Sequence, residues 1–346
     1  MRTKLVGSLL LSVLIVAAAY GQKAPRVQVV PDPVAPRVDV LIDGKPFTAY
    51  HYPRDWKKPA LFPIRTATGT PVTRGWPVEP RANERADHPH HVGLWFNYGD
   101  VNGLDFWNNS DAIGPDRAPK MGTVVHKRVV DATSGDDKGE LQVEMTWVDS
   151  KSTPLVNENT RYVFRGDAES RVIDRVTRLS ALKERVVLGD NKEGLIGLRV
   201  ARALEQPSKA PVVLTDASGK PQAKRVDNEG VTGEYLGSDG RKGDDVWGTR
   251  GPWTLLSGTV NGEQVTLAIL DHPSNPGFPT YWHARGYGLF AANNLGRNVF
   301  DPAQPEAKLT LEPGESVTFR HRVLILNGAA GADRMNAEHQ KFAQMN

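Results

Sequence analysis

The sequence contains no cysteine. This absence excludes disulfide bonds and a lipid anchor on a cysteine, so a sizeable packed core has to stabilise the fold. The chain also lacks an excess of charge of one sign, because 43 Lys and Arg residues are interleaved with 40 Asp and Glu residues, for a net charge of +3. Nucleic-acid-binding proteins usually show a basic run or face, so we expect no nucleic-acid partner.

Long hydrophobic runs are scarce as well. The exception is Leu5–Ala19, which follows the basic start Met1–Lys4 and precedes a short segment ending at Gln22. This order describes a secretory signal peptide, residues 1–21, and the run is too short for a comfortable transmembrane helix. We expect cleavage after Gly21 and a mature protein that is periplasmic or secreted, with no membrane span.

Several motifs that define enzyme classes are absent. The sequence has no Gly-x-Ser-x-Gly, no Walker loop, no dinucleotide-binding fingerprint and no His-Glu-x-x-His. A His-x-His pair is present, as in cupin metal sites, but the Glu expected a few residues later is missing. We therefore set the cupin interpretation aside.

Turn-forming residues are abundant instead, with 33 Gly and 25 Pro, and long helical periodicity is scarce. Turn signals at Asp43-Gly44 and Asn261-Gly262 predict hairpins, and only residues 332–345 favour a helix. Four segments alternate apolar and polar residues, as half-buried antiparallel strands do: Thr123–Val130, Glu140–Val148, Arg161–Arg165 and Arg171–Leu179. The sequence therefore predicts a single all-β domain over residues 22–346, a large antiparallel β-sandwich with a short C-terminal helix.

A histidine cluster stands out before an apolar, strand-like run. Three of the nine histidines, His88, His90 and His91, lie within four residues around Pro89. Proline disfavours a helical conformation in the residue before it, so His88 is expected to be extended. In an extended segment alternate side chains share a face, so His88 and His90 point together while His91 points away. Such a pair binds a metal ion or supplies an acid and a base, whereas the structural alternative is a set of loop histidines bonded to their own backbone.

Three other loop segments concentrate polar and aromatic residues, and in a sandwich they could converge on the face that carries the histidines. They offer Asn102, Asp105 and Trp107; Lys192 and Glu193; and His272, Asn275, Trp282, Arg285 and Tyr287. Each has a structural alternative: Asp105 ends a strand that buries Trp107, Lys192 and Glu193 form an exposed turn pair, and Trp282, Arg285 and Tyr287 only pack.

The residue types of this set suit carbohydrate chemistry. Aromatic faces contact the C–H faces of sugars, while Asn, Asp and Arg bind hydroxyls and carboxylates. His and Glu serve in general acid–base catalysis near neutral pH. We expect His88, His90, Glu193 and His272 to be catalytic, and the substrate to be held by His91, Asn102, Asp105, Trp107, Lys192, Asn275, Trp282, Arg285 and Tyr287.

Taken as a set, the motifs around His88, Asp105, Glu193, His272 and Arg285 resemble the DUF6807 family, whose members also carry the label PmoA-like or methane oxygenase. The resemblance covers about residues 35–328. It implies an exported bacterial protein with a galactose-mutarotase-like β-supersandwich. The site residues that the resemblance implies are His88, His90, His91, Glu193, His272, Asn275 and Arg285.

The leading hypothesis is an exported carbohydrate-active enzyme, a lyase, hydrolase or epimerase that acts on a sugar or an oxidised sugar. One rival is a carbohydrate-binding protein without activity, and another is a metal-dependent oxygenase, as the family label suggests. No cofactor is required by the leading hypothesis, although a divalent metal held by His88, His90 and His272 is an alternative.

Overall fold

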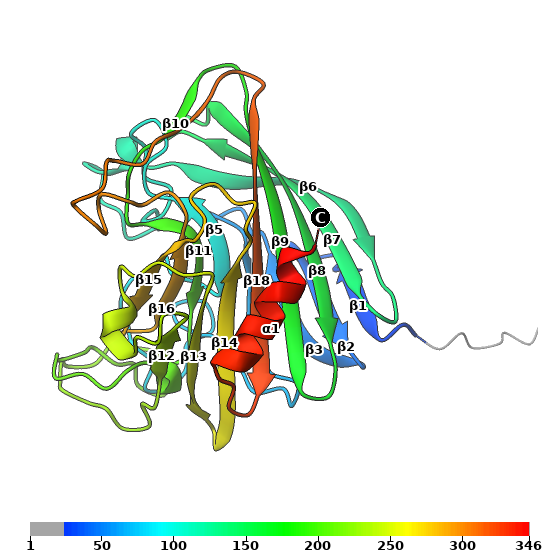
Figure 1. The fold of residues 1–346 in the computed structure, drawn as a ribbon, viewed down its shortest axis with the longest axis vertical. Helices are drawn as coiled ribbons and strands as arrows, with labels where there is room; N and C mark the ends of the chain where they lie inside the picture. Colours follow the sequence, from blue (N-terminus) through cyan, green and yellow to red (C-terminus); the bar gives the residue numbers. More distant parts are fainter. Residues whose placement is uncertain (1–23, 346) are drawn as a thin grey trace, which may run out of the picture.

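The computed structural model describes residues 24–345, so the expected signal peptide lies outside the described residues. Two eight-stranded sheets dominate this part of the chain (Figure 1). The first sheet has the order β1 (Val27–Pro31), β2 (Arg37–Ile42), β3 (Lys45–His51), β4 (Ala60–Leu61), β5 (Leu94–Tyr98), β11 (Gly194–Arg199), β16 (Leu289–Asn293) and β15 (Tyr281–Arg285).

The second sheet has the order β12 (Glu234–Gly237), β13 (Trp253–Val260), β14 (Glu263–Asp271), β18 (Ser316–Asn327), β9 (Ser170–Ala181), β8 (Pro154–Gly166), β7 (Gly139–Val148) and β6 (Thr123–Thr133). A small sheet pairs β10 (Val186–Leu188) with β17 (Leu309–Leu311). Single 3₁₀ turns occupy Ala118–Lys120, Arg202–Leu204 and Gly243–Val246, and α1 spans Ala332–Ala343. Neighbouring strands pair antiparallel throughout the described residues, which confirms the predicted antiparallel β-sandwich with a C-terminal helix.

The two predicted hairpins are confirmed. Asp43 and Gly44 have φ of 52° and 73°, and Asn261 and Gly262 have φ of 51° and 81°. Two positive φ values in a two-residue loop define the type I′ turn, whose twist matches that of the strands it joins. Asn and Asp tolerate this conformation better than other side chains, and Gly adopts it without steric cost.

The main core lies between the two sheets and follows the alternation of each strand. In β5, Leu94, Phe96 and Tyr98 belong to this core, whereas Trp95 joins a separate cluster with Trp107, Leu289 and Ala291. Because successive side chains of a strand point to opposite faces, the Trp95 cluster lies on the outer face of the first sheet.

Part of the outer face of the second sheet, over β13, β14 and β18, is covered by α1 (Figure 1). Met335 and Phe342 of the helix pack on a cluster that includes Trp253 and Leu270. Within residues 24–345, no helix is long and apolar enough to cross a membrane.

Candidate active site

A cavity of about 630 Å³ lies on the outer face of the first sheet, over its neighbouring strands β5, β11, β16 and β15. Three stretches that are far apart in the sequence form most of its wall. These are the loop before β5, the loop before β11, and β15 with the turn that follows it. The polar and aromatic residues they contribute are His88, His90, His91, Lys192, Glu193, His283, Arg285 and Tyr287, joined by Trp247.

Four of the rings form one continuous stack beside and beneath the cavity. The Tyr287 and His88 ring centroids are 4.9 Å apart at 6°, and those of His88 and His91 are 5.0 Å apart at 5°. Beneath them the rings of His91 and Trp95 lie 5.1 Å apart at 19°, and Trp107 packs against both. The stack holds the imidazoles at fixed orientations.

The expected geometry of the histidine cluster is wrong. His88 has φ of 45°, in the left-handed region, and the His91 amide donates to the His88 carbonyl at 3.0 Å. The chain therefore makes a turn with Pro89 at its second position, a place that proline favours. As a result His91 does not point away, and its ring centroid lies 4.3 Å from that of His90.

A buried ion cluster fixes this turn from below. The Asp87 carboxylate accepts hydrogen bonds from Arg74 at 2.9 Å and Arg199 at 2.6 Å, and its oxygen lies 3.2 Å from His88 Nδ1. Burial by itself would raise the pKa of Asp87. Arg199, His88 and Arg74 outweigh burial and hold that pKa well below its usual range. Asp87 therefore stays ionised and keeps the His88 proton on Nδ1, so the neutral ring carries an acceptor at Nε2.

His91 has the opposite arrangement. The Arg199 guanidinium can only donate, and it lies 3.3 Å from His91 Nδ1. The neutral ring therefore carries its proton on Nε2, which is buried and has no hydrogen-bond partner within the described residues. Burial, followed by His90 and Arg199, lowers the pKa of His91 well below its usual value, so the ring stays neutral. A buried donor without a partner is costly, which makes this N–H a candidate hydrogen-bond donor to a ligand in the cavity.

His283 is a residue that the sequence analysis missed. Its Nδ1 donates to the Lys192 carbonyl at 2.9 Å, which leaves Nε2 as the free acceptor of the neutral ring. Burial lowers the pKa of His283 to about 4, against a smaller opposing effect of Glu193. His283 and Arg285 both lie in β15 two positions apart, so they share a face, and this periodicity could have identified His283.

Charged groups line the cavity beside His283. Lys192 Nζ lies 2.5 Å from Glu193 Oε1. The Arg285 guanidinium lies over the rings of Trp247 and Tyr287, at 5.6 Å and 5.9 Å from their centroids. We find no carboxylate partner for Arg285 among the described side chains, so it is available to an anionic or hydroxylated ligand.

Two predicted residues lie elsewhere. His272 Nδ1 accepts from the Ser274 amide at 3.1 Å, and its Nε2 donates to the Met345 carbonyl at 3.0 Å. The Asn275 amide donates to Asp271 and to the Arg320 carbonyl, each at 2.7 Å. These contacts connect the end of β14 to β18 and to the C-terminal segment.

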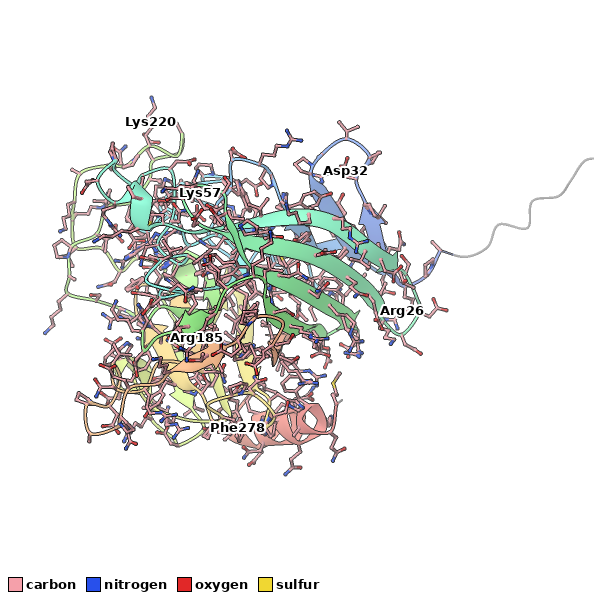
Figure 2. All side chains as sticks on the ribbon, turned by 90° about the horizontal axis from the view of Figure 1, so that it is seen from above. Arg26, Asp32, Lys57, Arg185, Lys220 and Phe278 are labelled. Carbon is pink, nitrogen blue, oxygen red and sulfur yellow. The ribbon has the colours of Figure 1, made fainter. Side chains whose placement is uncertain are left out.

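The loop of His272 reaches α1 through Phe278, whose ring stacks on His339 at 6.1 Å. Figure 2 shows Phe278 beside α1 and Lys57 on the other side of the molecule. His272 is therefore not brought to His88 and His90. Within the described part of the chain, no group of three or more His, Asp or Glu residues is arranged to hold a metal ion.

Four further predicted residues have structural roles. Asn102 bonds the Arg185 carbonyl at 3.0 Å and the Val187 amide at 2.7 Å. Asp105 accepts from the backbone and side-chain amides of Asn108, as a turn-capping residue does. Trp282 is fully buried in the main core, and Trp107 lies beneath His91 rather than on the cavity wall.

A family model described as "Family of unknown function (DUF6807)" matches residues 37–340. A comparison with curated proteins gives no match. Among solved structures, the chain is similar to the galactosidase domain of alpha-galactosidase-sucrose kinase AgaSK, with a TM-score of 0.41, 9% identity and coverage of 87% of this chain and 42% of that chain.

The GH36 alpha-galactosidase AgaB from Geobacillus stearothermophilus gives a TM-score of 0.35 at 12% identity, with coverage of 88% and 41%. A galactose mutarotase-like protein from Clostridium acetobutylicum gives 0.35 at 11% identity, with coverage of 88% and 100%. The chain thus spans about two fifths of the two galactosidase chains. The low TM-scores leave the function to be inferred from this chain's own residues.

Proposed function

The chain belongs to the DUF6807 family, whose function is unknown, and we propose that it is an exported enzyme that acts on a sugar or an oxidised sugar by acid–base catalysis. The observation that carries this proposal is the pairing of unlike imidazoles in one cavity. His283 offers an unprotonated Nε2, and His91 offers a protonated Nε2 without a partner among the described residues. One ring accepts a proton while the other donates a hydrogen bond, which is what proton transfer on a polar substrate requires.

The other cavity residues support a sugar as the substrate. Tyr287, His88 and Trp247 present aromatic rings, which suit the C–H faces of a sugar. Arg285 and Lys192 supply donors for hydroxyls, or for the carboxylate or keto oxygen of an oxidised sugar.

In the mechanism we propose, His283 Nε2 takes a proton from a hydroxyl or from a carbon beside a carbonyl group. His91 Nε2–H and Arg285 then stabilise the negative charge that develops on the substrate oxygen. The Glu193 carboxylate opposes the effect of burial on His283 and so favours the imidazolium, which then returns its proton to the product or leaving group. Lyases, hydrolases and epimerases all use this pair of steps, so the proposal covers the three classes.

The test is turnover of glycosides and 3-keto-glycosides, followed by mass spectrometry, for the wild type and His283→Asn. Asn keeps a donor to the Lys192 carbonyl but removes the base, so kcat should fall about 10²- to 10⁴-fold while substrate affinity changes little. His126→Asn, at a histidine of β6 outside the cavity, is the control. If the wild type turns over none of these compounds but binds them, the carbohydrate-binding alternative replaces the enzyme.

Export belongs to the same proposal and rests on residues 1–21. Expression of the full chain in a bacterial host, with N-terminal sequencing of the periplasmic fraction, should give a protein that begins at Gln22. Retention of the uncleaved chain in the cytoplasm would contradict export.

A further inference from the structure

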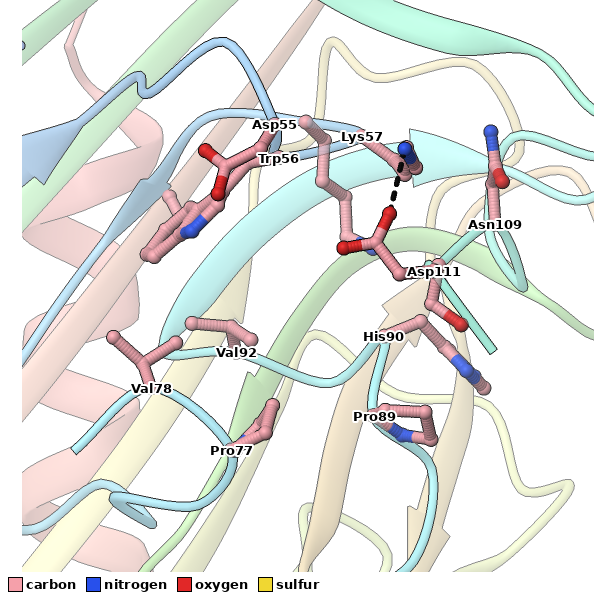
Figure 3. Close-up of a pocket in the computed structure, with 13 residues that line it drawn as sticks. Asp55, Trp56, Lys57, Pro77, Val78, Pro89, His90, Val92, Asn109 and Asp111 are labelled. Carbon is pink, nitrogen blue, oxygen red and sulfur yellow. Dashed lines mark ion pairs between the residues drawn. The ribbon is translucent and has the colours of Figure 1, made fainter. Parts of the chain in front are cut away.

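A second cavity of about 410 Å³ lies beside the first and shares His90 with it. Its wall comes mainly from residues 55–60 and 109–111. Figure 3 shows Trp56 and Val78 on one side and Asn109 and His90 on the other, with Lys57 paired to Asp111. Lys58 also lines this cavity.

Lys57 and Lys58 are adjacent in sequence but differ in their surroundings. The Lys57 ammonium lies 2.7 Å from Asp111, and its side chain is 31% exposed. Lys58 is 6% exposed and has no carboxylate within ion-pair distance in the part of the chain described. Its Nζ lies 5.5 Å from the centroid of the Trp95 ring and 3.5 Å from the Trp107 carbonyl oxygen.

A buried amine without a counter-ion loses its proton easily. Burial lowers the pKa of Lys58 to about 7, and the more distant Asp105 offsets this only in part. About half of the Lys58 amines are therefore neutral near pH 7, whereas an ordinary lysine is almost fully protonated. A neutral amine on a cavity wall is a nucleophile.

We propose that Lys58 forms an imine with the carbonyl group of an aldehyde or ketone, such as an open-chain or oxidised sugar, that enters this second cavity. The amine lone pair forms a C–N bond to the carbonyl carbon, and a proton moves from nitrogen to the oxygen. The C–O bond then breaks as the nitrogen lone pair forms the C=N bond. The departing oxygen takes up one further proton from solvent in the cavity, so the products are the protonated imine (iminium) and one water molecule.

The surroundings of Lys58 suit both states of the nitrogen. The Trp95 face stabilises a cation, so it favours the iminium, and the Trp107 carbonyl accepts an N–H from either state. His90, on the same wall, has a buried Nε2 with no hydrogen-bond partner among the described residues. That nitrogen is a further polar contact for a ligand that bears hydroxyl groups.

This inference goes beyond the proposed function, because it requires a carbonyl compound in the second cavity and not proton transfer by His283. The experiment incubates the full protein with glycolaldehyde and sodium cyanoborohydride, which reduces an imine to a stable amine. Peptide mass mapping then gives the labelling rate of each lysine between pH 6 and pH 9.

We expect Lys58 to be labelled at least about tenfold faster than Lys57 at pH 7, because burial favours the neutral amine of Lys58, whereas the Lys57 ammonium is paired with Asp111. The Lys58 rate should reach half of its maximum near pH 7, whereas the rate of a lysine with the unperturbed pKa should still rise at pH 9. Equal labelling of Lys58 and the exposed lysines, or an unlabelled Lys58 in the folded protein, would overturn the proposal.

Two variants separate this proposal from the proposed function. Lys57→Arg should keep the label on Lys58, and Lys58→Arg should lose it, with near-UV circular dichroism as the check of folding. His283→Asn should keep the Lys58 label while it loses turnover. Labelling of Lys58 without any turnover, or turnover with an unreactive Lys58, therefore identifies which of the two proposals fails.

Discussion

At the scale of single residues, three imidazoles differ because each has a different fixed partner. The Asp87 carboxylate and the Lys192 carbonyl accept hydrogen bonds from Nδ1–H of His88 and His283, respectively, whereas the Arg199 guanidinium donates a hydrogen bond to Nδ1 of His91. As neutral rings, His88 and His283 therefore each present an acceptor nitrogen to the cavity, whereas His91 presents a donor N–H. The positions of the histidines in the sequence do not predict which ring nitrogen carries the proton, because the partners that decide it come from other segments of the chain.

The pH dependence of catalysis tests the role of His283. Its pKa is lowered to about 4 by burial, so the free base is present above that pH and is lost as the pH falls below it. We expect the acid limb of the kcat/KM profile to have its midpoint near pH 4, well below the value of about 6.5 for an unperturbed imidazole. A midpoint near 6.5 would mean that an exposed histidine is the base.

The stability of the protein should report the protonation of Lys58. Its pKa is about 7 in the fold against 10.5 for an unperturbed lysine, so between these values the unfolded chain binds more protons than the folded one. Stability therefore rises as the pH increases from 7 towards 10.5. Below pH 7 the full penalty is present, and at 1.4 kcal/mol for each pKa unit it is roughly 4–5 kcal/mol.

Lys58→Met removes this penalty, so the variant should be more stable than the wild type at pH 7, by up to about 4 kcal/mol, with the gain shrinking towards pH 10. Urea unfolding at several pH values measures the difference. Lys57→Met, which removes only a partly exposed ion pair, should change stability by less than about 1 kcal/mol. A Lys58→Met variant that is less stable at pH 7 would contradict a neutral buried amine.

His283 and Lys58 also show how much of the site could be predicted from the sequence. His283 could have been predicted, because it lies two positions before Arg285 in β15 and therefore on the same face of the strand. Lys58 could not, since nothing in the segment Trp56-Lys-Lys-Pro59 distinguishes it from Lys57. Its burial depends on Trp95 and Trp107, which are distant in sequence and meet it only in the folded chain.

At the scale of elements, β11 positions the ring stack through a glycine. Gly197 lies opposite Trp95 in the neighbouring strand β5. A Cβ at this position would lie 2.6 Å from Trp95 and 2.8 Å from Trp107, closer than side chains pack. Glycine is therefore needed here for close approach, so that the two tryptophans can pack against β11 and support His91.

Gly197→Ala should displace both tryptophans, lower the unfolding free energy by about 1–3 kcal/mol and shift the tryptophan fluorescence. Because Trp95 stacks on His91, turnover should fall as well. Gly262→Ala is the control: it also strains the backbone, at φ of 81°, but its Cβ would meet nothing within 4 Å. That variant should lose about 1 kcal/mol and keep its activity, so equal activities of the two variants would contradict the role of Gly197.

The elements themselves were largely predictable, for local reasons. The Asp43-Gly44 and Asn261-Gly262 turns depend on the two residues of each loop, and the strands from β6 to β9 show regular alternation. The turn at Pro89 was mispredicted because the preference of a residue before proline is local, whereas Arg74 bonds the carbonyls of His88 and His91 from a distant segment.

At the scale of the whole molecule, the outer faces of the two sheets have different uses. The first sheet carries the two cavities described above, and α1 packs on part of the second. His272 follows β14 of the second sheet, so its position is set by the face that α1 covers. Sequence proximity to Arg285 suggested a shared site, but the chain passes from one sheet to the other between them.

This arrangement predicts that two variants affect stability without affecting chemistry. His272→Ala loses the hydrogen bond to Met345 and should lower the unfolding free energy by about 1 kcal/mol. Phe342→Ala leaves a gap between α1 and the second sheet and should cost about 3–5 kcal/mol. Both variants should retain wild-type kcat at temperatures where they are folded, because the cavity of His283 lies over the other sheet. A large loss of kcat in folded His272→Ala would contradict this prediction. It would mean that His272 is a catalytic residue and that the second sheet takes part in the reaction.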